Sequence, residues 1–275
     1  MKVLMGSVAA IVAAVMVGSA WSADSAAPGQ PAAGNAAGAK AAAGKSAGAS
    51  GASVHGITGT WNRYPEIDEK PDPKFPPASP VPPPPLKAQY LADWQAQQKA
   101  AKDADARGQP LFTDYVQCLP DGMPAMMMGM FPMEVLQTPG QVTVIQEAYN
   151  QVRRVYLNEK QIPLEEAEPG YWGHSVGHWE GETLVIDTVG IKPNVKFRGA
   201  PHSDQLRIRE RLTLIPPKYM QDEVTVEDPV YLTAPWNFVY KYKRYPGYKM
   251  NEYVCDSNRE YKDSENGGTR LRIPK

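Results

Sequence analysis

The region from Gln141 to Cys255 is a series of short segments rich in Val, Ile, Thr and Tyr. Turn-forming residues separate these segments at intervals of about 8 to 12 residues, a pattern that favours β-strands over helices. Tight turns between successive strands favour antiparallel neighbours in up-and-down order. The pattern predicts strands near 141–148, 152–158, 171–179, 182–189, 205–215, 222–228, 236–245 and 248–256.

A further strand is expected at 57–64, which brings the number of predicted strands to about nine. It contains Gly59 and Trp61, a Gly-x-Trp motif that resembles the first strand of lipocalin-type barrels. We therefore expect a mostly β fold, an antiparallel meander that forms a lipocalin-like barrel or a strongly curved sheet. A β-sandwich is the alternative.

The chain begins with the pattern of a secretory signal peptide. Lys2 precedes an apolar run from Val8 to Val17, and small residues follow, which predicts a signal peptide at 1–23. Residues 24–53 are almost entirely Ala, Gly and Ser, which predicts a disordered leader. We expect a single β-rich domain at 54–257 and a mobile tail at 258–275.

Two segments of the expected domain do not have strand character. Repeated prolines at 65–85 exclude a helix or an inner strand and predict an extended polyproline segment. The following segment, 86–107, predicts one amphipathic helix, because a single helical stripe carries its larger apolar residues, Leu86, Tyr90, Leu91, Trp94 and Ala101.

The cysteine content indicates the cellular compartment of the protein, and the net charge indicates which kinds of partner it can bind. Cys118 and Cys255 are the two cysteines of the chain, and in an oxidising compartment we expect them to form a disulfide. The net charge of -1 argues against a nucleic-acid partner. No stretch after the signal segment has the length and apolarity of a membrane span. A periplasmic or secreted location is expected, and the sequence leaves the oligomeric state open.

The segment "YWGHSVGHWEGETLVIDT" (171–188) predicts a β-hairpin with polar groups on one face. A two-residue turn at Glu180 and Gly181 would place His174 opposite Asp187. A His with a carboxylate partner can carry a proton, although many such pairs are only hydrogen-bonded sheet pairs.

The segment "QLRIRERLTLI" (205–215) places a carboxylate among apolar residues. Glu210 shares a strand face with Leu206, Ile208, Leu212 and Leu214, whereas the arginines at 207, 209 and 211 point the other way. A buried Glu210 needs a cation or a raised pKa, and Arg153 or Arg154 is the expected cation. Glu210 is either a buried ion-pair partner or a catalytic acid or base.

Other candidate site residues lie on a loop and on one strand. His202 lies on the loop before the Glu210 strand, and such loops often carry functional groups. The segment 236–245 presents four rings on one face, which fits either core packing or the wall of a ligand cavity, and these are Trp236, Phe238, Tyr240 and Tyr242.

Two metal sites are alternatives, and neither is favoured. His174, His178 and His202 could form a zinc set, but positions four apart on a strand lie about 13 Å from one another. The methionines of "GMPAMMMGMFPM" (122–133) could bind cuprous ion, although methionines more often fill irregular apolar space. We expect no metal.

The chain also resembles a family of exported bacterial proteins of largely unassigned activity. The motifs that carry the resemblance are "GMP" (122–124), "PMEVLQTPGQVTVIQEAYNQVRRVYLN" (132–158), "GHSVGHWEGETLVIDTVG" (173–190), "PHSDQLRIRERL" (201–212), "VEDPVYLTAPW" (226–236) and "EYVCDSN" (252–258). The chain departs from the pattern at Glu182, where relatives carry Asp, and at Ile162-Pro163, where they carry His-Pro. The resemblance implies one exported β-rich domain.

The sequence lacks the motifs of serine hydrolases, phosphate-binding loops and dinucleotide-binding folds, so no cofactor is expected. We expect an exported β-barrel-like protein that binds a small apolar or aromatic molecule. Arg153, Arg154 and the four rings would contact this ligand. If the protein is an enzyme, His174, Asp187, His202 and Glu210 would perform isomerase or lyase chemistry by acid–base catalysis. The alternatives are a non-catalytic carrier, an envelope interaction protein and a periplasmic protein that binds Zn or Cu.

Overall fold

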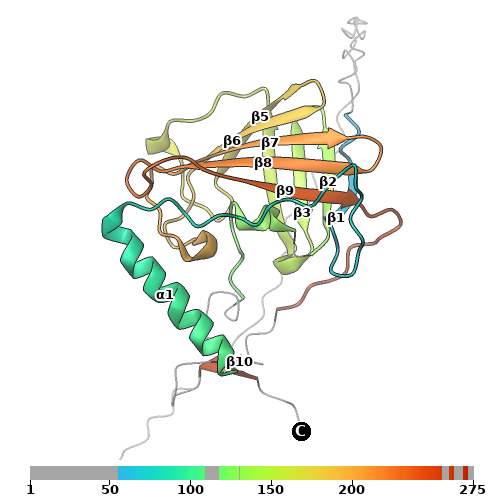
Figure 1. Ribbon diagram of the computed structural model, residues 1–275. Helices are drawn as coiled ribbons and strands as arrows, with labels where there is room; N and C mark the ends of the chain where they lie inside the picture. Colours follow the sequence, from blue (N-terminus) through green and yellow to red (C-terminus); the bar gives the residue numbers. More distant parts are fainter. Residues whose placement is uncertain (1–54, 109–117, 130, 256–259, 263–268, 272–275) are drawn as a thin grey trace, which may run out of the picture. The chain divides into compact units, whose positions relative to one another are not determined.

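Nine strands form a closed barrel in the computed structural model (Figure 1). The structure describes residues 55–108, 118–129, 131–255, 260–262 and 269–271, so the expected signal peptide (1–23) and leader (24–53) lie outside the described residues. The barrel strands are β1 (Gly59–Arg63), β2 (Met133–Thr138), β3 (Gln141–Gln146), β4 (Gln151–Leu157), β5 (His174–Glu180), β6 (Thr183–Val189), β7 (Arg207–Ile215), β8 (Tyr219–Glu227) and β9 (Trp236–Arg244). The expectation of a mostly β, lipocalin-like barrel is confirmed.

Each strand pairs with its neighbours in the sequence, and β9 pairs with β1 to close the barrel. All pairs are antiparallel except β4 and β5, which run parallel. Parallel neighbours need a crossover connection, and residues 158–173 provide it. The expectation of an entirely antiparallel meander was therefore wrong at this pair.

Closure of the barrel is supported by an arginine at the end of β9. Trp61 lies opposite Arg244 in the β1–β9 ladder, and the guanidinium carbon lies 4.4 Å from the centre of the Trp61 ring. The same guanidinium donates to the backbone oxygens of Gly56 and Thr58. Gly59 has a φ of 131°, and a Cβ there would lie 3.1 Å from an Arg244 nitrogen. The Gly-x-Trp motif thus gives the closing arginine room and a ring to pack on.

Two strand assignments made from the sequence differ from the structure. β2 was not predicted, because Met133, Glu134, Leu136 and Gln137 are common in helices and only Val135 and Thr138 are β-branched. The strand predicted at 248–256 is absent, since residues 248–255 have neither strand nor helix structure. The closed β1–β9 pair leaves no free edge at which this segment could pair.

One α-helix, α1 (Ala88–Ala106), occurs among the described residues, close to the predicted 86–107. Trp94 Nε1 donates to the carbonyl oxygen of Arg198 in η5 (Phe197–Gly199), 3.0 Å away, and the Tyr90 ring packs on Tyr231. The helix therefore contacts the loops that precede β7 and β9. No helix in the described part of the chain is long and apolar enough to cross a membrane.

The proline-rich segment that precedes α1 contains no helix or regular strand, and it includes hydrogen-bonded turns at 66–69 and 72–75. It lies along β9, because Lys241 Nζ donates to Pro76 O and Trp236 Nε1 donates to Pro82 O. The bridge between Leu86 and Leu232 continues this contact to the start of the helix.

A short methionine-rich turn covers one end of the barrel. The 3-10 helix η2 (Ala125–Met128) contributes Met126 and Met127, which are buried in the same apolar cluster as the interior of the barrel. Gln146, the last residue of β3, donates to Met126 O, and Tyr242 of β9 donates to Met127 O. The methionines fill the space between the strand ends and are part of the core.

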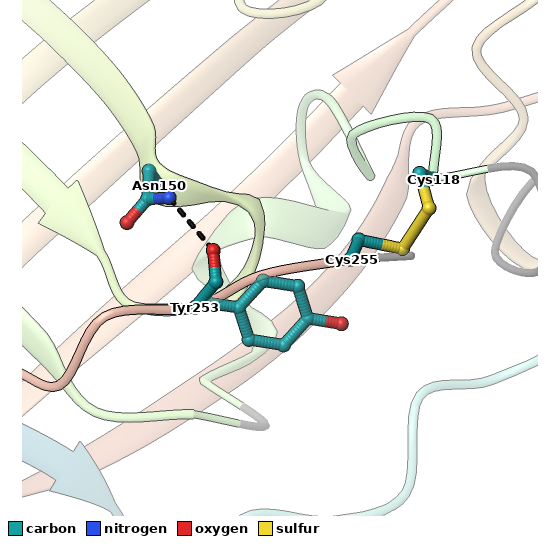
Figure 2. The surroundings of a disulfide bond; sticks show 4 residues. All are labelled: Cys118, Asn150, Tyr253 and Cys255. Carbon is teal, nitrogen blue, oxygen red and sulfur yellow. Dashed lines mark hydrogen bonds between the residues drawn. A yellow bond between two sulfur atoms is a disulfide. The ribbon is translucent and has the colours of Figure 1, made fainter. Parts of the chain in front are cut away.

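The segment after β9 is fastened beside this covered end (Figure 2). Cys118 and Cys255 form the predicted disulfide, with their Cα atoms 5.6 Å apart. Asn150, in η3 (Ala148–Asn150), donates to the backbone oxygen of Tyr253. The buried carboxylate of Glu147 accepts hydrogen bonds from the Tyr248 hydroxyl and the Asn251 backbone. Side-chain contacts thus replace the predicted strand.

Two short strands, β10 (Glu260–Lys262) and β11 (Thr269–Leu271), pair antiparallel within the segment that was expected to be a mobile tail. The remainder of the tail after Cys255 lies outside the described residues.

Removal of the disulfide should destabilise the fold, because the bridge joins residues 137 positions apart and restricts the unfolded chain. The double variant Cys118→Ser/Cys255→Ser should lose up to about 5 kcal/mol of unfolding free energy. In urea unfolding, the variant and the reduced wild-type protein should have the same midpoint, and it should lie below the midpoint of the oxidised wild type. An unchanged midpoint for both would show that the bridge does not contribute to stability.

Candidate functional site

The barrel interior contains a buried ion pair. Arg153 of β4 and Glu210 of β7 are 1% and 0% exposed, and Arg153 Nη1 donates to Glu210 Oε1 at 2.8 Å. The second guanidinium nitrogen, Nη2, contacts the other carboxylate oxygen, so the pair is bidentate. The alternation in β7 predicted this inward carboxylate, and the structure identifies Arg153 as its cation.

Two hydroxyl groups complete the arginine's hydrogen bonds. Arg153 Nη2 lies 3.0 Å from Thr188 Oγ1 of β6 and 3.2 Å from Ser175 Oγ of β5. Ser175 and Thr188 are cross-strand partners, and their hydroxyl oxygens are 2.8 Å apart. One side chain from β4 thus contacts β5, β6 and β7.

A second carboxyl group, Asp222 of β8, is also fully buried in the interior. Neither of its oxygens accepts a hydrogen bond from the described residues. Burial raises its pKa well above the ordinary value, and the neighbouring Glu210 carboxylate raises it further, against the opposing effect of Arg153. These effects favour the protonated, neutral form of Asp222, in which the carboxyl group can donate a hydrogen bond.

Tyr240 of β9 lies directly opposite Asp222 in the ladder. Its hydroxyl oxygen is buried and has no hydrogen-bond partner among the described residues. Burial, with a contribution from Asp222, raises the pKa of Tyr240 well above its usual range, so the phenol stays neutral. The interior polar cluster, Arg153, Ser175, Thr188, Glu210, Asp222 and Tyr240, thus spans strands β4 to β9.

The predicted pairing of His174 with Asp187 was wrong. The loop of the hairpin is formed by Gly181 and Glu182, one position later than expected, so His174 lies opposite Val189 and Asp187 lies opposite Val176. The left-handed φ of 61° at Gly181 suits the loop at this position.

Both residues of the predicted dyad have other partners on the outer face. His174 Nδ1 lies 2.8 Å from Gln161 Oε1, and Asp187 forms an ion pair with Arg209 at 3.0 Å. Gln161 also donates to the backbone oxygens of both residues. Here they fasten the β4–β5 crossover to the sheet.

The predicted ligand-binding residues divide between the interior and the surface. Phe238, Tyr240 and Tyr242 are buried in the core, as is Trp236 at the start of β9. Arg154 is exposed and alternates with the buried Arg153, so it does not reach the interior. Of the two candidate arginines, Arg153 alone enters the barrel.

His202 lies in a different place, beside a small cavity near the methionine-covered end. The cavity has a volume of about 30 Å³, and its walls are mainly apolar, including Met123, Val195, Phe197, Leu206, Leu232 and Trp236. His202 Nδ1 is 2.9 Å from the backbone oxygen of Ser203. The other ring nitrogen, Nε2, is shielded from solvent and has no hydrogen-bond partner among the described residues.

A buried aspartate holds the loop that carries His202. The two oxygens of Asp228 accept hydrogen bonds from the backbone and hydroxyl of Ser203. They also accept from the backbone nitrogens of Val230 and Tyr231. Asp228 therefore fixes the 201–206 loop against the loop before β9, and the cavity lies between these loops and the barrel.

The structure does not bring the predicted zinc ligands together. His178 is exposed and lies 3.2 Å from Glu180, whereas His174 and His202 have the contacts given above. In the part of the chain that is described, no three His, Cys, Asp or Glu residues cluster as a metal site requires.

Comparisons with models of protein families, with curated proteins and with solved structures found no match to this chain.

Asp222 and the cavity were missed by the sequence reasoning. Asp222 alternates with Met220, Val224 and Val226 on the inner face of β8, the same signal that identified Glu210. The predicted strand began at 222, so the first apolar residue of this stripe was left out. The cavity has no local signal, because its walls come from segments between 123 and 236.

Breaking the interior ion pair should be far more costly than removing it entirely. Arg153→Met leaves the Glu210 carboxylate buried and unpaired, which should cost about 3–5 kcal/mol of unfolding free energy. The double variant Arg153→Met/Glu210→Leu should recover most of this loss in urea unfolding. Arg209→Met, which breaks the exposed pair with Asp187, is the control and should cost less than about 1 kcal/mol. Equal losses of unfolding free energy in the single and double variants would contradict the assignment of Arg153 and Glu210 as a buried ion pair.

Asp222 should make stability depend on pH. Because its pKa is raised in the folded state, the folded protein binds more protons than the unfolded chain, and stability falls as the pH rises above the ordinary value of 3.8. Asn cannot ionise, so the stability advantage of Asp222→Asn over wild type should grow with pH, by at most about 1.4 kcal/mol per unit.

Urea unfolding between about pH 5 and pH 8 measures this difference. Glu223→Gln, on the outer face of the same strand, is the control and should show a constant difference from wild type. A constant difference for Asp222→Asn as well would mean that Asp222 is ionised in the barrel.

Proposed function

We propose that this protein binds a small apolar molecule, without catalysis, at the covered end of the barrel. The observation that carries this proposal is the cavity between the barrel and its loops. Its walls are apolar and aromatic, and they include a histidine nitrogen that has no hydrogen-bond partner in the described part of the chain. Pockets with mostly apolar walls and a few polar groups are typical of small-molecule sites.

The distribution of the predicted catalytic residues favours binding over chemistry. Acid–base catalysis would need His174, Asp187, His202 and Glu210 to face one substrate. His174 and Asp187 lie on the outer face, Glu210 is paired with Arg153, and only His202 lines the cavity. The arrangement supports a carrier or a binding module.

The cavity is small, and a ligand must enlarge it. A volume of about 30 Å³ is far below the roughly 300–1,000 Å³ that is typical of small-molecule pockets. Of the wall residues only Val226 and Trp236 belong to barrel strands, and the others lie on connecting segments. The walls can therefore move outward without breaking the strand ladders.

We further propose that binding takes place outside the cytoplasm. The disulfide between Cys118 and Cys255 fits an oxidising compartment. The resemblance to exported bacterial proteins and the signal pattern at 1–23 point in the same direction.

Filling the cavity should abolish binding. Toluene is a suitable probe, and titration followed by NMR chemical shifts should show saturable binding to the wild type. Ala200 is a buried wall residue, and Ala200→Leu should weaken toluene binding at least about tenfold. The same substitution at an exposed helix position, Ala96→Leu, should leave binding unchanged. Binding that survives Ala200→Leu would place the ligand elsewhere.

A further inference from the structure

The two ring nitrogens of His202 have different hydrogen-bonding roles. Nδ1 lies 2.9 Å from the backbone oxygen of Ser203, and a carbonyl oxygen can only accept a hydrogen bond. Nδ1 therefore carries the proton in the neutral ring. In this tautomer Nε2 is an acceptor, and it is the atom that is shielded from solvent without a partner in the described structure.

No side-chain donor of the cavity wall is left to satisfy this acceptor. Trp236 Nε1 donates to Pro82 O at 3.0 Å, so its single proton is already used. Asp228, the other polar wall residue, is held by hydrogen bonds that it accepts from Ser203, Val230 and Tyr231. Among the described side chains that line the cavity, the polar atoms are thus either acceptors or occupied donors.

The charge of the site limits the ligand as well. An anion would meet the Asp228 carboxylate and the lone pair of Nε2, and the described wall contains no Lys or Arg. A cation would lose its hydration among Phe197, Leu206 and Leu232. The negative charge of the wall, on Asp228, is already engaged by four hydrogen bonds from the protein. A neutral ligand fits both limits.

We propose that the ligand is a neutral apolar molecule with a hydroxyl group, such as a phenol or an alcohol, whose O–H donates to His202 Nε2. This inference rests on the proposed function, because it names the class of molecule that the same cavity binds. His202 is then the residue that determines specificity, and Phe197 and Trp236 contact the apolar part of the ligand. The hydroxyl supplies the donor that the wall lacks.

Phenol and anisole form the test pair, because they have similar rings but only phenol can donate a hydrogen bond. Dissociation constants are measured by NMR titration at about pH 8, where imidazole is ordinarily neutral. The wild type should bind phenol about tenfold more tightly than anisole, which corresponds to one hydrogen bond of about 1.4 kcal/mol. His202→Phe keeps a ring but lacks the acceptor, and it should bind the two compounds equally.

His178→Phe is the matched control, because His178 is exposed and lies outside the cavity. It should keep the preference of the wild type for phenol. In wild-type protein labelled with ¹⁵N at histidine, phenol should shift the Nε2 resonance of His202, and anisole should not. This measurement decides the question even if His202→Phe does not fold.

The outcomes separate the inference from the proposed function. Equal binding of phenol and anisole by the wild type, both sensitive to Ala200→Leu, would overturn the role of His202 and leave the binding function intact. A preference for phenol that persists in His202→Phe would also overturn the inference. Failure of phenol, anisole and toluene to bind would overturn both proposals and would mean that the cavity holds at most water.

Discussion

The buried contact between Arg153 and Glu210 is the interaction on which the interior of this barrel depends. A charged group without water needs a partner of opposite charge and a full set of hydrogen bonds. Arg153 has its partner of opposite charge in Glu210 and further hydrogen bonds to Ser175 and Thr188. These three residues belong to β7, β5 and β6, so a single guanidinium joins four consecutive strands. The parallel β4–β5 ladder has only three residue pairs. Arg153 adds a side-chain contact between these two strands.

The same cluster explains how a second carboxyl group can lie in the barrel. Arg153 supplies one positive charge, which the Glu210 carboxylate already balances. The neutral, protonated form of Asp222 is therefore favoured, because it adds no second negative charge to the cluster. Tyr240 faces Asp222 as a neutral phenol, so the polar interior carries no net charge. The polar part of the core and the proposed binding cavity are separate features of one barrel.

The features that could be predicted from the sequence are those that depend on alternation within one strand. In β7 the alternation identified the inward Glu210 and the outward arginines, and in β9 it identified the buried rings. Features that depend on register between strands were less predictable. A hairpin loop shifted by one position was enough to separate His174 from Asp187, although both strands had been located. The parallel crossover was also missed, although the long interval between β4 and β5 was a sign of it. The cavity beside His202 depends on tertiary contacts between distant loops, which no local pattern encodes.

The pairing of β1 with β9 has a consequence for the order of folding. The two strands that close the barrel lie near opposite ends of the domain, at 59–63 and 236–244, so the ring cannot close until almost all of the domain is available. Contacts of such long sequence separation form slowly, because the entropy of closing the long loop must be overcome first. A growing chain therefore keeps an open sheet edge until β9 is available. In the export proposed above, late closure would keep the chain unfolded and able to pass through a narrow translocation channel.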